Sequence, residues 1–142
     1  MTLKEQIEEI YLSTEGLEDK QSIETHKVLR IIKHQIVGEE YNLEIINLKD
    51  SRIARILEGF LIQVEKRLTS DNEILRVNAG YQQTALTSII PTRLTQEELT
   101  TTIQTALTEN PVATYEDVLV YLDDYFYDLS LAFPTYQSLT SL

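Results

Sequence analysis

A proline followed by a helix-capping pattern divides this chain into two parts. Pro91 lacks a backbone N–H and disfavours helical backbone at the residue before it, so a helix that arrives through Ile90 must end there. Thr95 and Glu98, which follow, have the spacing of a capping box, in which each side chain bonds the backbone N–H of the other residue. We therefore expect a new helix to begin at Thr95.

Apolar residues recur at helical spacing on both sides of this division, and no alternating pattern typical of β-strands competes with them. The sequence therefore predicts an all-α protein. We expect a bundle of long antiparallel helices over residues 1–90, because the connections between the predicted helices are short. A smaller helical subdomain with an uncharged tail is expected over residues 91–142.

The clearest helix follows Asp50, which is a favourable N-cap. Its apolar residues form one uninterrupted stripe of Ile53, Ile56, Leu57, Phe60, Leu61, Val64 and Leu68. Ser70 and Glu73 again have capping-box spacing and predict the next helix. The residues of that helix expected to face the core are Ile74, Val77, Tyr81, Ala85 and Ile89. An earlier helix, which begins near Asp19, either ends at Gly38 or continues past it.

The last segment, residues 129–142, contains no charged side chain. Its large apolar residues include Leu131, Phe133, Tyr136, Leu139 and Leu142. Because contiguous apolar surface rarely stays exposed to water, we expect this tail either to fold back on its own bundle or to insert into a partner. Pro134 restricts where a helix can begin within the tail.

The composition limits the class of protein. Of the 142 residues, 42% are hydrophobic, which is ordinary for a folded globular chain. The absence of cysteine excludes disulfides, thiolate catalysis and cysteine-based metal sites. No apolar run approaches the roughly 20 residues that a membrane span needs, and the N-terminus lacks a signal-peptide pattern. We therefore expect a cytoplasmic protein that makes no membrane contact.

The formal charge of −11 is unevenly distributed along the chain. Residues 77–142 contain eight acidic residues and a single basic one, Arg93. Such a field repels nucleic acid, so any contact with RNA would need a local basic strip.

Motifs that carry catalytic chemistry are missing. The sequence contains no nucleophile motif and no histidine pair at metal-ligand spacing, and its four glycines do not form a phosphate-binding loop. We expect no catalytic residue, no metal, no cofactor and hence no intrinsic enzymatic activity.

Two sets of side chains are candidates for binding. The best basic strip consists of Lys27, Arg30, Lys33 and His34. It is either a contact for phosphates or an acidic partner, or a solvated helix face balanced by Glu24, Glu39 and Glu40. A second set is aromatic, and we interpret it as a candidate protein interface made of Tyr121, Tyr125, Tyr127, Phe133 and Tyr136.

The segment around the proline also resembles a known family. Ile90-Pro91, Leu94, Thr95 and the run Glu97-Glu98-Leu99 are similar to the "LP-x-x-L-S-x-E-E-L" hallmark of YqeY-like proteins. The opening residues 2–7 and the basic-apolar segment 26–33 resemble the start of that family, and residues 56–68 resemble its "vL…kqR-x-S" segment. The resemblance spans about residues 2–122.

This resemblance implies a small helical protein, similar to the tail domain of GatB, a subunit of the tRNA-dependent amidotransferase, a carbon–nitrogen ligase. Such a protein would have no activity of its own and would act through protein or tRNA contacts. The family's "D-M-G-k-V-M" turn and the lysine-rich stretch after it are replaced here by Tyr115-Glu116-Asp117-Val118-Leu119 and an acidic segment, which disfavours tRNA. The alternative is a phage or host adaptor protein whose apolar tail docks on a larger assembly.

Overall fold

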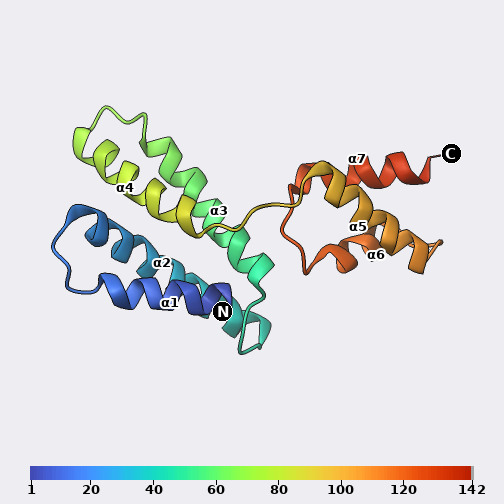
Figure 1. The fold of residues 1–142 in the computed structure, drawn as a ribbon, viewed down its shortest axis with the longest axis horizontal. Coiled ribbons are helices and arrows are strands. Elements are labelled where there is room, and N and C mark those ends of the chain that lie inside the picture. The colour runs from blue at the N-terminus through green and yellow to red at the C-terminus, as the bar shows by residue number, and fades with distance from the viewer. Residues whose placement is uncertain (142) are drawn as a thin grey trace. The chain divides into compact units, whose positions relative to one another are not determined.

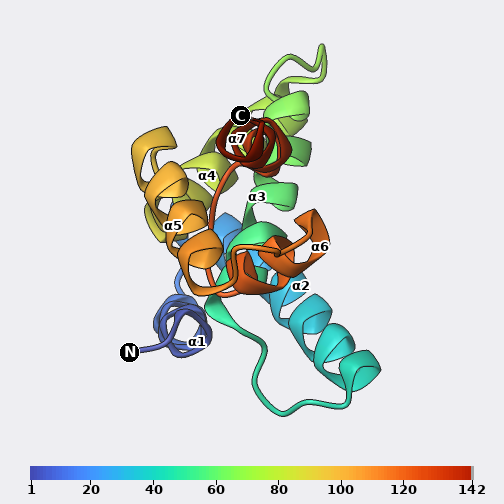
Figure 2. The same ribbon diagram turned by 90° about the vertical axis from the view of Figure 1, so that its right-hand side faces the viewer.

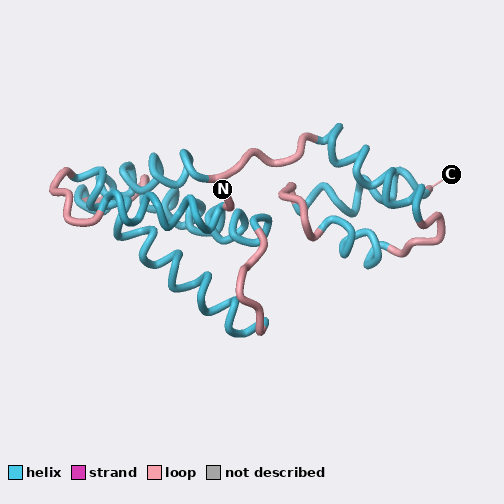
Figure 3. The backbone as a smooth tube through the Cα atoms, turned by 60° about the horizontal axis from the view of Figure 1, so that its bottom comes forward, coloured by secondary structure: helices cyan, strands magenta, loops and turns pink. Residues whose placement is uncertain are grey.

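Residues 1–141, which the computed structural model describes, form seven α-helices and no β-strand (Figures 1 and 3). The predicted all-α fold class is thereby confirmed. The chain divides into two compact units, one from Met1 to Ile90 and one that begins at Pro91. None of the helices in residues 1–141 combines the length and the apolar character that crossing a membrane requires.

The first unit consists of α1 (Leu3–Thr14), α2 (Lys20–Leu43), α3 (Asp50–Arg67) and α4 (Glu73–Ile89). Helices α1 and α2 form one antiparallel hairpin and α3 and α4 form another (Figure 1). The two hairpins pack through contacts of α2 with α4 and of α1 with α3. Their shared core contains fully buried aliphatic side chains, among them Ile7, Leu29, Ile32, Ile53, Leu57 and Leu86.

Two helix boundaries in this unit follow from local chemistry. Asp19 caps α2, because its Oδ2 accepts a hydrogen bond from the Ser22 N–H at 3.0 Å. Gly38 lies inside α2, which continues to Leu43 and ends at Glu44 in the left-handed conformation with φ of 56°. The question that the sequence left open at Gly38 is therefore answered in favour of one long helix.

The N-cap predicted for α3 is wrong. Lys49 occupies the N-cap position, where its side chain does not cap the helix, and Asp50 is the first helical residue. The Asp50 carboxylate instead accepts a hydrogen bond from the Leu3 N–H, with an Oδ1–N distance of 3.1 Å. Asp50 thus ties the start of α1 to the start of α3, a contact that no local sequence pattern reveals.

The capping box and the inward face predicted for α4 are also wrong. Asn72 caps the helix, since its Oδ1 accepts hydrogen bonds from the N–H groups of residues 74 and 75. Ile74 is 71% exposed and Val77 is 41% exposed, whereas Ala79 and Leu86 are buried. Ala85 and Ile89 belong to both the predicted and the observed buried face of α4. Relative to the prediction, the helix is rotated so that the small side chain of Ala79 enters the core.

The second unit consists of α5 (Gln96–Glu109), α6 (Tyr115–Leu122) and α7 (Leu129–Thr140). The predicted capping box at the start of α5 is confirmed: the Glu98 N–H donates to Thr95 Oγ1 at 3.1 Å and the Thr95 N–H donates to Glu98 Oε1 at 2.9 Å. The core of this unit comprises Leu99, Ile103, Ala113, Val118, Leu122, Tyr127 and Ala132.

The uncharged tail folds back on its own unit. Residues 129–140 form α7, which packs against α5, and Leu131, Tyr136 and Leu139 lie against the core of the second unit. Pro134 lies inside α7 rather than before it. Leu142, the last apolar residue of the predicted tail, lies outside the described residues. The structure thus shows the first of the two arrangements that the composition allowed.

Candidate functional site

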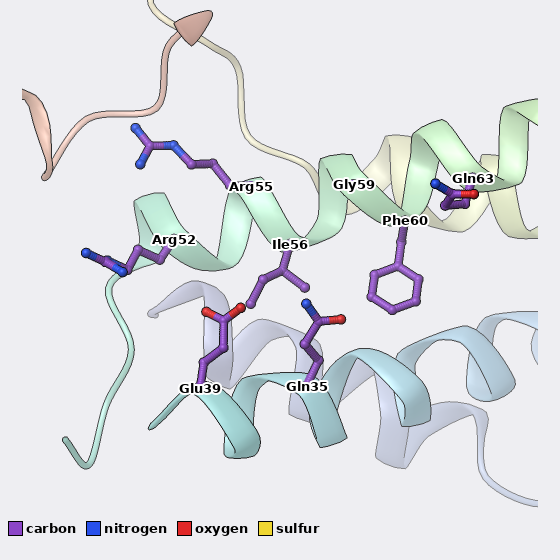
Figure 4. Close-up of a pocket in the computed structure, with 8 residues that line it drawn as sticks. All are labelled: Gln35, Glu39, Arg52, Arg55, Ile56, Gly59, Phe60 and Gln63. Atoms are coloured by element: carbon purple, nitrogen blue, oxygen red, sulfur yellow. The ribbon is translucent and has the colours of Figure 1, made fainter. Parts of the chain in front are cut away.

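A groove of about 430 Å³ lies between α2 and α3 (Figure 4). Its lining residues are Gln35 and Glu39 of α2 and Arg52, Arg55, Ile56, Gly59, Phe60 and Gln63 of α3. Ile56 and Phe60 point from α3 toward α2, and Gln35 and Glu39 point from α2 toward α3 (Figure 4). The groove therefore has an apolar floor between amide and charged side chains.

Gly59 leaves this groove open. It lies in the interior of α3, where glycine costs about 1 kcal/mol of helix stability relative to alanine. A Cβ built on Gly59 would meet no heavy atom within 4 Å, so nothing in the chain itself requires glycine here. The missing side chain allows another molecule to approach the backbone of α3 closely.

The charges around the groove have both signs, since Glu39 lies on one wall and Arg52 and Arg55 lie on the other. In the described part of the chain, no three histidine or acidic side chains are placed together so that they could hold a metal ion. What the groove offers is apolar contact with Ile56 and Phe60, flanked by hydrogen-bonding amides and by charges of opposite sign.

Sequence reasoning missed this groove. It placed Ile56 and Phe60 in the core-facing stripe of α3, and Ile56 is indeed buried, but Phe60 remains half-buried. The available signal was Gly59, a glycine in the middle of the most regular helix of the chain. Glycine alone did not locate the groove, because a Cβ at Gly38 or Gly80 also meets no heavy atom within 4 Å; what distinguishes Gly59 is its place in the groove lining.

The predicted basic strip is divided by the structure. Lys33 forms an ion pair with Glu8 of α1, and its Nζ lies 3.9 Å from the centre of the Tyr11 ring. Lys27 contacts Glu24 on its own helix, with an Nζ–Oε1 distance of 3.4 Å. Arg30 and His34 are exposed on the outer face of α2. The strip as a contact for phosphates or an acidic partner stays a prediction.

The predicted aromatic interface needs one correction. Tyr127 is only 3% exposed and belongs to the core of the second unit, so it offers no surface to a partner. The reason is that α6 ends at Leu122, after which the chain turns Tyr127 inward. Tyr136 is half-buried, and its hydroxyl donates a hydrogen bond to the Ala113 carbonyl at 3.0 Å.

The remaining members of the aromatic set are accessible. Phe133 is 49% exposed and packs edge-to-face on Tyr115, with the ring centres 5.0 Å apart. Tyr121 and Tyr125 stack with ring centres 6.3 Å apart. Burial raises the pKa of the Tyr121 phenol, and the negative charge of Glu109 raises it further. An interface role for these residues stays a prediction.

No family model, curated protein or solved structure matches this chain.

Proposed function

We propose that this chain is a non-catalytic, YqeY-like helical protein of the cytoplasm that acts by binding another protein, and that the groove between α2 and α3 receives a segment of that partner. The resemblance of residues 2–122 to the YqeY-like family supports the first part. The open, apolar groove supports the second part.

The charges of the groove favour a protein segment over a nucleic acid. A phosphodiester backbone carries charge of one sign and would meet Glu39 on the wall formed by α2. A protein segment can present both signs, so that an acidic group faces the arginines of α3 and a basic group faces Glu39. The chain as a whole carries a charge of −11, which further disfavours RNA.

The single observation that carries this proposal is the groove itself, whose lining includes Ile56, Gly59 and Phe60 and in which Gly59 adds no side chain. The partner segment lies along α3 there, with its backbone close to Gly59 and an apolar side chain between Ile56 and Phe60. Ordinary peptide-binding sites use the same combination, in which an apolar anchor supplies affinity and polar rim groups supply orientation.

The experiment uses helical peptides that are selected from a random library for binding to the full chain. Gly59→Leu fills the groove, and we expect it to weaken binding of the selected peptides at least about tenfold. Gly80→Leu is the matched control, because Gly80 also lies inside a helix and has no heavy atom within 4 Å of a built Cβ. Selected peptides that bind both variants equally well would contradict the proposal.

The alternative function, an adaptor in a phage or host assembly, would use the surface of α7. Most apolar side chains of the tail lie against its own unit, but Leu129 and Phe133 remain 58% and 49% exposed. In this alternative, these two exposed apolar side chains would form the contact of the tail with a larger assembly.

A further inference from the structure

The outer face of α2, opposite its buried face, carries a self-complementary pattern. Arg30, Lys33 or His34, Val37 and Tyr41 follow one another along α2 at spacings of three and four residues, as residues in the contact seam of paired helices do, and Glu44 follows at the C-cap, three residues after Tyr41. Val37 is 61% exposed and Tyr41 is 83% exposed. Basic side chains precede Val37, and an aromatic and an acidic side chain follow it. The last turns of α2 extend beyond the other helices of the first unit (Figure 2).

A depression beside this seam has the shape needed to receive a side chain from a second packed helix. It measures about 300 Å³ and is lined by Tyr11 of α1 and by Arg30, Lys33, His34 and Val37 of α2. The four α2 residues have the spacing i, i+3, i+4, i+7, which is the arrangement that receives a knob when two helices pack. Its lining is basic and aromatic, and it has room for a phenol ring.

The middle of the seam allows two helices to approach each other. Gly38 follows Val37, is exposed, and would place a Cβ with no heavy atom within 4 Å. A glycine inside a helix lowers the stability of that helix. Within a single copy of the chain, no packing contact requires glycine at this position. Small residues at the point where two helices cross permit close contact of the backbones.

We propose that this face binds the same face of a second copy of the chain, with the two α2 helices antiparallel and the two-fold axis at Val37 and Gly38. Arg30 and Glu44 lie equally far from Val37 on opposite sides, so Arg30 of each copy faces Glu44 of the other. Tyr41 of each copy fills the depression that Tyr11, Arg30 and Val37 help to line in the other. A two-fold interface uses the same surface of both copies, so that surface must be complementary to itself in charge and shape. The face of α2 meets this requirement about Val37, and we therefore identify its partner as a second copy of the chain.

The projecting end of α2 is held in place before association. Glu40 is buried, and its Oε2 accepts hydrogen bonds from Lys4 Nζ at 2.7 Å and from the Leu48 N–H at 2.8 Å. These contacts join the last turns of α2 to α1 and to the loop before α3. Tyr41 is therefore presented on an ordered helix end and Glu44 on its C-cap, which lowers the entropic cost of association.

The test is sedimentation equilibrium of the full chain over a range of concentrations. We expect a reversible dimer with twice the 16.4 kDa chain mass. Arg30→Glu and Glu44→Arg should each weaken the dimer at least about tenfold, because each places two like-charged pairs in the interface. The double variant Arg30→Glu/Glu44→Arg should regain the dimer, since the reversed pairs are again of opposite sign.

Control variants carry the same charge changes away from the seam. Glu18 is exposed just before α2 and Lys20 is the exposed first residue of α2, so Glu18→Arg and Lys20→Glu should leave the dimer unchanged. Circular dichroism of each variant checks that the helices remain folded. Tyr41→Ser, which removes the knob without changing charge, should also dissociate the dimer.

A chain that stays monomeric at every concentration would overturn this inference, as would a dimer that single charge reversals leave intact or that the double reversal does not restore. The groove between α2 and α3 is a separate surface, so Gly59→Leu should leave the dimer intact. Failure of peptide binding and failure of dimerisation are therefore distinguished by different variants.

Discussion

At the scale of single residues, Glu40 shows how one buried charge is stabilised. Burial alone raises the pKa of this carboxyl group, but the hydrogen bonds from Lys4 and Leu48 and the positive charge of Lys4 outweigh burial. The pKa of Glu40 therefore lies below its ordinary value of 4.5. Lys4 also donates hydrogen bonds to the Ile46 carbonyl at 3.2 Å and to Asn47 Oδ1 at 3.5 Å, so it contacts the loop after α2 as well as Glu40.

We expect Glu40→Gln to lower the free energy of unfolding by about 1–3 kcal/mol at neutral pH, because a charge-assisted hydrogen bond is lost. Because the folded pKa is below the unfolded one, the contribution of Glu40 is complete above the unfolded value and is lost as the pH falls through the folded value. The difference between wild type and variant should therefore shrink below about pH 4.5. Urea denaturation at several pH values measures this.

The control for this prediction is Glu9→Gln, which removes the same charge from an exposed position on α1. Exposed charges contribute little to stability, so this variant should differ from wild type by less than about 0.5 kcal/mol at any pH. An equal loss in both variants would show that net charge, rather than the contact of Glu40 with Lys4, sets the stability.

At the scale of elements, the capping box determines where α5 begins. Thr95→Ala should lower the free energy of unfolding by about 1 kcal/mol, since it leaves the Glu98 N–H without its acceptor. Glu98→Ala should cost less, and the double variant should cost less than the sum, because both side chains serve one box. Denaturation of the three variants measures this, and full additivity would mean that the two bonds are independent.

A second prediction at this scale concerns the packing of α7 against α5. Deleting residues 130–142 would remove Ala132 from the core of the second unit and expose Leu99 and Ile103. We expect the melting temperature to fall while the number of chains per particle in solution stays unchanged, because the contact is intramolecular. Unchanged stability together with a smaller assembly or the loss of a bound partner would instead indicate that the tail serves an external interface, as the adaptor alternative requires.

At the scale of the whole molecule, charge decides whether RNA can bind. The chain carries −11, and its second unit contributes Arg93 as its single basic residue. We expect no complex with tRNA at micromolar protein in roughly physiological salt, because phosphate binding requires neutralising cations. Gel filtration with and without tRNA measures this. A salt-sensitive complex that Lys27→Glu plus Arg30→Glu abolishes would contradict the expectation and make the basic strip a tRNA site.

Local patterns predicted what depends on neighbouring residues along the chain. The box joins Thr95 and Glu98, which are three positions apart, and the apolar stripe of α3 repeats every turn, so both could be recognised from spacing alone. The basic strip was located on one helix, but its division could not be foreseen, because Lys33 binds Glu8 across a helix pair. The groove was missed because its two walls are far apart in sequence.

The sequence by itself therefore determined the all-α class, the ending of a helix before Pro91 and the first turn of α5, since these depend on hydrogen bonds and steric limits within a few residues. Only the tertiary structure decided which face of α4 is buried, whether Asp50 caps its own helix or binds Leu3, and how Glu40 is paired. These outcomes depend on contacts between helices, where burial and pairing of distant groups outweigh the local preferences of any one segment.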